Sequence, residues 1–441
     1  MSPAFEAMLN RSWMAELRAQ NVSLETVAEV LARVVAAAPE PVPRVDIADG
    51  TMLAGAPKLP RGSVSRASSV LLKLKMLQAQ DAVSARPGRP IVPLRLSRHW
   101  TLAGVQVSDP AGQPPAAVGV LISLDGSPVG EKITQAVRQP LSEASLLDAV
   151  TAVVEQLRTR TKSSTLLGLG VGLGGRIFTG LAASRNLSLL CDALSHRLNM
   201  PTVIENGVDA QAVREVWRRD PASKRQRFPQ PHFAVVGLYR DSVSSALVIN
   251  RKVYRGDHDL AGGVGHLTVD YRTPLPVSPA QTGARGFYAP CSCGRGFGHL
   301  ETLATPDRIA GQTGLPFEQA ARQPLDRRSP VTAAFRTGGE ALGRGISAML
   351  DIANPGQILL LLPESLARAE KGTAAAAYES ALRSAVDRYS YSAALDGAVS
   401  RPTLIMDEID PDGSVSAAQA AAACVLDSFI AYARGEQAVT P

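Results

Sequence analysis

The stretch from Ala261 to Glu301 constrains most strongly what this chain can fold into. It contains A-G-G-V-G-H at Ala261–His266, then a segment rich in proline and glycine, then C-S-C-G-R-G-F-G-H-L-E at Cys291–Glu301. Imidazole and thiolate groups are preferred ligands of Zn²⁺, and four of them form a closed structural site. A reduced Cys-x-Cys pair in a metal-free loop is the alternative. The stretch predicts a structural zinc site built from His266, Cys291, Cys293 and His299.

The size and composition of the chain favour a globular protein of a reducing compartment. Its 441 residues are enough for two or three domains, and 45% of them are hydrophobic, which allows sizeable cores. The four cysteines show no disulfide-like pattern, and Cys191 and Cys424 stand alone among apolar residues. Neither a secretory leader nor an apolar run near 18 residues is evident. We therefore expect a cytoplasmic protein with no membrane partner.

Positive charge is concentrated in one segment near the N-terminus. Nine Lys and Arg residues lie between Lys58 and Arg98, where Asp81 is the single acidic residue. This segment carries a charge of +8 whereas the whole chain carries +6, so the remainder is close to neutral. A basic block on a near-neutral body is typical of a nucleic-acid-binding module. A solvated basic face is the alternative interpretation.

The order of elements around this basic block suits a winged helix-turn-helix. Ser23–Ala37 has apolar residues at helical spacing behind a Ser23 N-cap, and a short helix fits around Val45–Leu53. Ser63–Gln80 predicts a basic helix whose first turns would meet base edges in a major groove. Arg86–Pro90 suits a wing that clamps phosphates, with a basic linker as the alternative. The predicted DNA-contacting residues are Arg61, Ser63, Ser65, Arg66, Ser68, Lys73, Arg86 and Arg89.

From Trp100 onward, predicted strands alternate with predicted helices. We expect strands at 100–107, 117–124, 166–173, 201–205, 233–238, 245–249, 357–362 and 402–406, and helices at 142–157, 192–198, 209–217, 330–352 and 373–389. Such alternation predicts an α/β body, with two lobes and a cleft between them. Ala417–Ala423 is interpreted as an alanine-rich helix surface.

Several motifs of this body follow one another in a characteristic order. They are G-R-P-I-V-P-L-R-L at Gly88–Leu96, L-G-L-G-V-G-L-G-G at Leu167–Gly175, S-R-N-L at Ser184–Leu187, E-N-G-V-D-A at Glu205–Ala210, the segment Arg251–Gly256, G-V-G-H at Gly263–His266 and the cysteine stretch at Cys291–Glu301. This order resembles the ROK family of repressors, open reading frames and kinases. The resemblance implies a winged helix-turn-helix domain over residues 1–97. It also implies a two-lobed sugar kinase/actin-like ATPase (ribonuclease H-like) body over residues 98–441.

The resemblance also implies roles for particular residues. Asn206, His266 and Glu301 fall on positions that hydrogen-bond a sugar in the family, and His266 also falls on a metal-ligand position. The third cysteine ligand of the family is replaced by His299, and the loop before Cys291 is longer. Two histidines and two cysteines remain a suitable tetrahedral set for Zn²⁺.

Other family elements, those needed for phosphoryl transfer, are replaced. The aspartate that acts as general base in ROK kinases corresponds to Gly207, and Asp209 would point elsewhere. The phosphate turns correspond to Gln106–Asp109 and to residues 240–246, and neither has the glycines that let backbone N–H groups approach phosphate. The glycine pair that faces adenosine in the family corresponds to Leu362–Pro363. We therefore expect a protein that is not an enzyme.

The matches and the departures together predict a ROK-type transcriptional regulator, most simply a repressor. It would bind a double-stranded DNA operator as a homodimer or homotetramer, so that two recognition helices reach two half-sites. The family's sugar contacts at Gly207 and Gly263 are missing, so a sugar effector, another effector and no effector all remain open. A sugar kinase with an atypical site and a non-catalytic interaction protein are the alternative functions.

Overall fold

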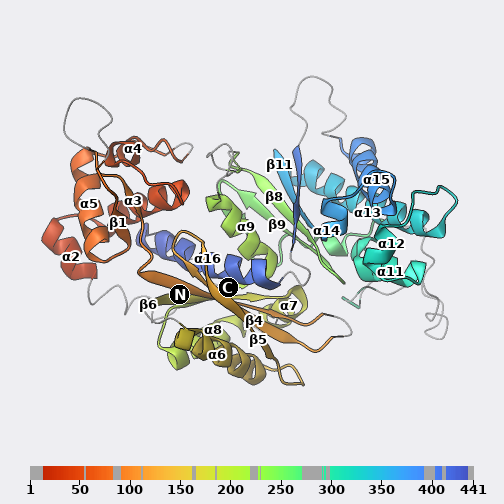
Figure 1. Cartoon of the computed structure of the whole chain (residues 1–441), viewed down its shortest axis with the longest axis horizontal. Coiled ribbons are helices and arrows are strands. Elements are labelled where there is room, and N and C mark those ends of the chain that lie inside the picture. The colour runs from red at the N-terminus through yellow and green to blue at the C-terminus, as the bar shows by residue number, and fades with distance from the viewer. Residues whose placement is uncertain are drawn as a thin grey trace. The chain divides into compact units, whose positions relative to one another are not determined.

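Figure 1 shows the computed structural model of the chain, coloured from the N-terminus to the C-terminus. It describes residues 13–53, 56–82, 91–110, 113–160, 165–183, 186–218, 227–228, 230–270, 291, 293–294, 298–391, 403–409 and 414–435. Contacts between residues divide the chain into two units. The first unit comprises residues 1–109, 113–229 and 414–441, and the second comprises residues 110–112 and 230–413. The C-terminal helix therefore belongs to the first unit, although the chain reaches it only after completing the second.

The N-terminal part of the first unit has the winged helix-turn-helix order of elements. Its helices and strands are α2 (Trp13–Gln20), α3 (Leu24–Ala37), α4 (Arg44–Asp49), α5 (Arg61–Lys73), β1 (Leu77–Ala79) and β2 (Leu94–Leu96). The Ser23 hydroxyl caps α3 as predicted, because it accepts a hydrogen bond from the Thr26 amide at 3.2 Å. Strands β1 and β2 pair in antiparallel orientation. The predicted boundary between a DNA-binding domain and a body, at residue 97, stays a prediction.

The helix predicted at Ser63–Gln80 is shorter than expected. It ends at Lys73, and Lys75 has a φ of 55°, in the left-handed region, which an α-helix cannot continue through. The chain then forms β1, in which the buried Leu77 lies opposite Leu96. The prediction was wrong here because a short apolar run fits a buried strand and a helix equally well.

The rest of the first unit is a five-stranded sheet with helices on both faces. The order is β5-β4-β3-β6-β7, with β3 parallel to β6 and β6 parallel to β7, while β4 is antiparallel to β3 and β5. The strands are β3 (Trp100–Ser108), β4 (Ala116–Ser123), β5 (Pro128–Ala136), β6 (Thr165–Leu173) and β7 (Thr202–Asn206). The helices are α6 (Glu143–Arg160), α7 (Gly175–Ala183), α8 (Leu187–Leu198), α9 (Gly207–Trp217) and α16 (Ser414–Ala433). Side chains alternate across β3, so Ala103 and Val105 pack toward α6 while Leu102 packs in the cluster that contains α16.

Helix α16 contributes many side chains to the hydrophobic core of this unit, and Figure 1 shows it beside the sheet. The interpretation of Ala417–Ala423 as a helix surface is wrong, because Ala418, Ala421 and Ala422 are fully buried. A Cβ atom on Gly170 would lie 1.7 Å from the Ala421 carbonyl oxygen, and one on Gly104 would lie 1.8 Å from that of Ala418. The glycines of β3 and β6 thus let the helix backbone approach the sheet closely.

The same helix contradicts the expectation that no apolar run near 18 residues exists. Over 18 residues of α16 the mean hydropathy reaches 1.4, which is enough to cross a membrane by length and composition alone. In the structure 61% of that window is buried, between β3, β6, α9 and α3. Helix α16 therefore has the setting of a core helix.

The second unit is another five-stranded sheet covered by helices, so the predicted α/β class is confirmed. The order is β10-β9-β8-β11-β12, with β8, β11 and β12 parallel. The strands are β8 (Phe233–Leu238), β9 (Val243–Ile249), β10 (Lys252–Tyr254), β11 (Gln357–Leu362) and β12 (Thr403–Glu408). The helices are η1 (Val264–His266), α10 (Glu301–Ala304), α11 (Pro306–Thr313), α12 (Phe317–Ala321), α13 (Pro330–Ala353), α14 (Glu364–Ala367) and α15 (Ala374–Tyr389). Strands β8 and β11 begin and end at the predicted residues.

Candidate metal centre and nucleic-acid interface

Four metal-ligating side chains meet in the second unit, and they are those the sequence predicted. One ligand atom each of His266, Cys291, Cys293 and His299 lies within 4.8 Å of all the others. The His266 Nδ1 to Cys291 Sγ distance is 3.3 Å, and the Cys293 Sγ to His299 Nδ1 distance is 3.6 Å. Tetrahedral zinc with Zn–N of about 2.0–2.1 Å and Zn–S of about 2.3 Å separates neighbouring ligand atoms by roughly 3.3–3.8 Å. The cluster could therefore hold a metal ion without rearrangement of these two pairs.

The backbone around the cluster explains why the glycine-rich loop brings His266 to this place. A Cβ atom on Gly265 would lie 2.1 Å from the Val243 carbonyl oxygen, so only glycine lets the loop lie against β9. On the other side His299 forms a β-bridge with Thr268, two residues after His266. The two histidines are thereby fixed to adjoining backbone segments, with ring centroids 6.1 Å apart.

A buried carboxylate borders this cluster. The Cys291 thiol donates a hydrogen bond of 2.8 Å to Glu301 Oε1, and that oxygen lies 3.8 Å from His266 Nδ1. Burial and the bond to Glu301 raise the pKa of the Cys291 thiol well above its ordinary value. Burial and the neighbouring His266 lower the pKa of His299, which favours the neutral imidazole, the form that binds a metal. A metal ion that bound here would displace the thiol proton.

The three predicted effector residues do not all lie in one unit. His266 and Glu301 are neighbours in the second unit, whereas Asn206 ends β7 in the first. The Asn206 side-chain oxygen accepts a hydrogen bond of 3.3 Å from the Val208 amide and so caps α9. The assignment of these residues to an effector stays a prediction.

Next to Asn206, Gln106 fills the space beside Gly207, a position that its assignment to a phosphate-turn segment did not predict. A Cβ atom on Gly207 would lie 3.3 Å from Gln106 Oε1, and one on Gly172 would lie 2.2 Å from it. Gln106 is buried, and its Oε1 has no hydrogen-bond partner among the described residues. A polar residue inside the apolar run Leu102–Val107 was the signal that could have identified it. No carboxylate stands at position 207, and a side chain from β3 occupies the adjoining space.

The segment that corresponds to a phosphate loop is a tight turn. The Tyr239 amide donates to the Ser242 carbonyl at 2.9 Å, directly before β9 begins. Arg240 forms an ion pair of 2.9 Å with Asp307 of α11, and the Asp307 amide donates to the Arg240 carbonyl at 2.9 Å. The turn is thus tied to α11 through both its backbone and its side chain.

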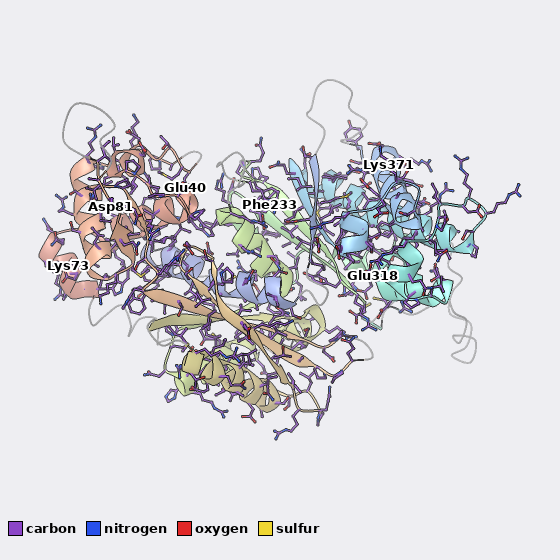
Figure 2. The ribbon with its side chains drawn as sticks, viewed as in Figure 1. Glu40, Lys73, Asp81, Phe233, Glu318 and Lys371 are labelled. Carbon is purple, nitrogen blue, oxygen red and sulfur yellow. The ribbon has the colours of Figure 1, made fainter. Side chains whose placement is uncertain are left out.

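The predicted DNA-contacting residues differ in their exposure along α5. Arg61, Ser65 and Arg66 are exposed, Ser63 is half-buried, and the exposed Lys73 (labelled in Figure 2) pairs with Glu16 at 2.9 Å. Ser68 is fully buried on the core side of the helix, so its predicted role in DNA contact is wrong. It lies one residue from Ala67 and three from Leu71, and both of these are also core residues. Arg86 and Arg89 lie outside the described residues.

A chain of polar contacts connects α4 and the segment before α5 with helix α16. Arg33 of α3 is fully buried and donates to the carbonyls of Ile47 (2.7 Å), Ala48 (3.2 Å) and Pro57 (2.5 Å), at the end of α4 and before α5. Its Nε also donates to Glu29 at 2.8 Å, and Glu29 accepts from Arg434, directly after α16, at 2.5 Å. Burial raises the pKa of Glu29, but Arg33 and Arg434 more than offset it, so this pKa is lowered.

The other end of this chain of contacts reaches α9. Trp217 Nε1 donates to Asp427 of α16 at 2.9 Å, and Gln211 Nε2 donates to Ser416 at 3.2 Å. Helix α16 thus contacts both the helix that Asn206 caps and the helices around α5. Sequence reasoning missed Arg33, since a charged residue in an amphipathic helix is normally exposed.

Comparison with known proteins shows relatives of two kinds. The sequence pattern of the ROK family matches residues 129–390. The chain is 28% identical over 131 residues to N-acetyl-D-glucosamine kinase of Histophilus somni, which covers 28% of this chain and 40% of that protein. It is 24% identical over 221 residues to a putative xylose repressor of Caldicellulosiruptor sp., which covers 44% of this chain and 50% of that protein. The chain thus spans half or less of the length of these curated relatives.

Solved structures with the same fold include a regulator and a kinase. A ROK family transcriptional regulator, a homologue of the E. coli MLC protein, superposes with a TM-score of 0.63 at 15% identity and covers 93% of this chain and 100% of that one. The ROK hexokinase of Thermus thermophilus gives a TM-score of 0.50 at 19% identity, over 74% of this chain and 97% of that one. These likenesses confirm the expected fold. Because the family pattern covers more than half of the residues, the chain belongs to the ROK family.

Proposed function

We propose that this protein is a DNA-binding transcriptional regulator of the ROK type, acting as a repressor. The observation that carries the proposal is a basic, exposed helix start on α5, within a winged helix-turn-helix attached to a ROK body. A protein named as a putative xylose repressor is among the relatives, which supports the same class. The regulator would work in the cytoplasm as a homodimer or homotetramer, so that two copies of α5 reach two operator half-sites.

Arg66 provides the direct test of DNA binding. Its guanidinium is exposed on the second turn of α5, where a recognition helix meets base edges. Arg66→Ala is expected to weaken binding to the operator by about tenfold or more, since one good bidentate contact to a base contributes roughly 1–3 kcal/mol. Fluorescence anisotropy with DNA from upstream of the protein's own coding sequence measures the change.

A matched substitution separates this effect from a general loss of charge. Arg197 of α8 is also an exposed arginine, paired with Asp148 at 2.9 Å. Arg197→Ala should leave the affinity for the operator within about twofold. Equal affinities of the wild type and the Arg66 variant would remove the assignment of α5 as the recognition helix.

We further propose that the body does not transfer phosphate. Gly207 offers no proton acceptor, Gln106 fills the space beside it, and the turn at Arg240 is tied to Asp307. A sugar kinase with an atypical site is the second candidate, favoured by the relatedness to N-acetyl-D-glucosamine kinase. A coupled assay of ATP turnover with a panel of hexoses and N-acetylhexosamines distinguishes the two. We expect no turnover, and formation of any sugar phosphate would support the kinase instead.

We infer that α16 transmits changes in the body to the DNA-binding helices. A sugar-type effector that contacted Asn206 would act on α9, because Asn206 caps this helix. Trp217 of α9 donates to Asp427 of α16, and Arg434, directly after α16, donates to Glu29 of α3. Glu29→Gln replaces two charge-assisted hydrogen bonds by weaker ones, a loss of about 1–1.5 kcal/mol. We expect amide hydrogen exchange in α5 to become about tenfold faster. Glu25→Gln, a substitution at an exposed position of the same helix, should leave amide exchange in α5 unchanged. Exchange in α5 as slow in the Glu29 variant as in the Glu25 variant would contradict a link through α16.

The His/Cys cluster is proposed to hold one structural zinc ion. His266, Cys291, Cys293 and His299 supply four ligands, the number that a closed structural site requires. Metal analysis of the purified protein should find about one zinc per chain, and Cys293→Ser should reduce it severalfold and lower Tm by several degrees. Cys191→Ser, at a cysteine of the first unit, should leave the zinc content unchanged. Wild-type protein that refolds with the same Tm in the presence of a chelator would contradict a structural role.

A further inference from the structure

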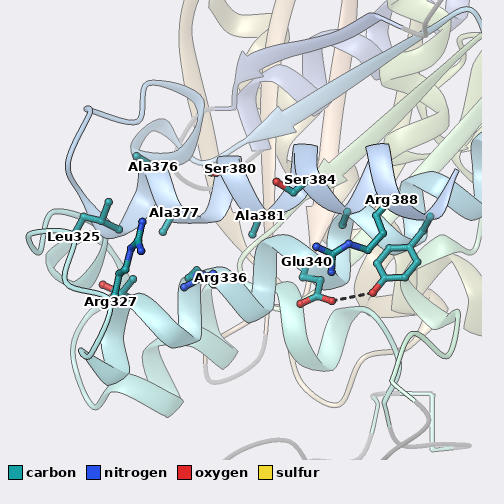
Figure 3. A pocket seen from close by; sticks show the side chains of 13 residues that line it. Leu325, Arg327, Arg336, Glu340, Ala376, Ala377, Ser380, Ala381, Ser384 and Arg388 are labelled. Carbon is teal, nitrogen blue, oxygen red and sulfur yellow. Dashed lines mark hydrogen bonds between the residues drawn. The ribbon is translucent and has the colours of Figure 1, made fainter. Parts of the chain in front are cut away.

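A groove on the second unit runs between helices α13 and α15 (Figure 3). Its volume of about 490 Å³ lies within the range of small-molecule sites. Over most of its length the face that α15 turns to the groove carries small side chains, which leave the space open, and Arg388 and Tyr389 follow at the end of the helix. The small residues are Ala376, Ala377, Ser380, Ala381, Ser384 and Ala385. Neither serine hydroxyl makes a hydrogen bond among the described residues, so both can donate to a ligand.

Three arginines line this groove. Figure 3 shows Arg327 and Arg336 toward one end and Arg388 toward the other, with the small residues of α15 between them. Arg327 and Arg336 form neither an ion pair nor a hydrogen bond within the described part of the chain. The Arg388 guanidinium lies 6.0 Å from the centre of the Tyr389 ring, and its charge also attracts the Glu340 carboxylate without a direct hydrogen bond. Five N–H donors on each guanidinium are therefore available at both ends of the groove.

Other arginines of the same two helices are neutralised. Arg344 of α13 pairs with Glu340 at 2.7 Å, and Arg383 of α15 pairs with Glu379 at 2.9 Å. Burial raises the pKa of Glu340, but its hydrogen bond to Arg344 outweighs this, so the pKa is lowered and the carboxylate stays charged and paired. Glu340 is the single acidic residue that lines the groove. The groove thus keeps an excess of positive charge that its own neighbours do not cancel.

We propose that this groove binds a small organic molecule with an oxyanion group at each end. Planar guanidinium groups bind phosphate and carboxylate in a bidentate manner, which suits the two ends. A polar or sugar-like middle would lie over the two serines and the alanines. Arg388 follows Ala377 by three turns of α15, about 16 Å, so an elongated molecule engages both ends better than a compact anion does. This site is separate from α5 and from the residues that the proposed function uses.

Isothermal titration of the full chain at about 150 mM salt tests the proposal. The probes are fructose 1,6-bisphosphate, fructose 6-phosphate, a linear dicarboxylate and inorganic sulfate. The bisphosphate or the dicarboxylate should bind at least about tenfold more tightly than the two single-ended anions, a difference of about 1.4 kcal/mol. The preferred probe then identifies the oxyanion. Equal binding of all four probes would overturn the proposal.

Two variants test whether the probe binds in this groove and whether its affinity depends on more than the net positive charge of the protein. The double substitution Arg327→Ala, Arg336→Ala should weaken the preferred probe by about tenfold or more, whereas Arg383→Ala, on another face of α15, should change it less than about twofold. Equal losses in both would overturn the site. Displacement of the bound probe by short random duplex DNA would identify a DNA-phosphate surface instead. Arg66→Ala, the variant that tests operator binding, should leave the affinity for the probe unchanged. The proposal for the groove can therefore be tested even if the protein does not bind the operator.

Discussion

Arg33→Met is expected to lower the free energy of unfolding of the first unit by about 3–5 kcal/mol and to abolish operator binding. The fully buried guanidinium satisfies the carbonyls of Ile47, Ala48 and Pro57, and it also pairs with Glu29. When one partner of a buried, charge-assisted hydrogen-bond network is removed, the remaining polar groups stay desolvated but lose their hydrogen bonds. This loss lowers the free energy of unfolding more than the removal of an exposed pair does. Methionine keeps most of the side-chain volume, so the effect measures lost hydrogen bonds rather than a cavity.

The loss of DNA binding has a structural reason. Pro57 precedes α5, and Ile47 and Ala48 lie in the last turn of α4, so Arg33 fixes the spacing of these two helices of the motif. Denaturation followed by tryptophan fluorescence reports on this unit alone, since Trp13, Trp100 and Trp217 all belong to it. Arg18→Met, an exposed substitution on α2, is the control and should alter stability by less than about 0.5 kcal/mol. An Arg33 variant as stable as the control would show that the buried network contributes little.

Gly170→Ala is expected to destabilise the same unit by about 3 kcal/mol or more. The added Cβ atom would lie 1.7 Å from the Ala421 carbonyl oxygen and 2.3 Å from its carbon. Both are backbone atoms of α16, so no flexible side chain can move aside and the whole helix must shift. Overpacking of this kind costs about 1–3 kcal/mol even where side chains can adjust.

The Gly170 variant also tests the coupling through α16. A helix displaced from the sheet would disturb the bond between Glu29 and Arg434, so operator binding should fall together with stability. Gly180→Ala is the matched control, because a Cβ atom there meets no atom within 4 Å. It should leave the unit unchanged or slightly more stable. A Gly170 variant with wild-type stability would mean that α16 packs less closely than described.

Local patterns in the sequence predicted much of the fold. Strands β8 and β11 have the expected bounds because their continuous apolar runs end at polar or turn residues. The Ser23 cap is a contact within four residues, so the sequence around it is sufficient. Strand β5 was missed because most of its side chains are exposed at the edge of the sheet, where no apolar alternation is needed.

The sequence likewise predicted some of the candidate site residues and not others. Residue type and spacing alone identified His266, Cys291, Cys293 and His299, and the structure brings their ligand atoms within 4.8 Å. The exposed positions on α5 followed from a helical face, but Ser68 did not, since a small polar residue fits either side of a helix. The anion-binding groove was not predicted, because its walls come from separate helices whose facing residues are visible only after folding.

The sequence by itself determined the family, the α/β class, the basic helix and the four ligands of the proposed metal centre. Each of these depends on residue types at short spacing or in a fixed order along the chain. Tertiary structure alone decided that Ala417–Ala423 is core, that Gln106 stands beside Gly207, and that Arg33 is buried against α4 and the segment before α5. These facts depend on which distant segments pack together, and burial of alanine, glutamine or arginine is set by those neighbours rather than by the residue's own polarity.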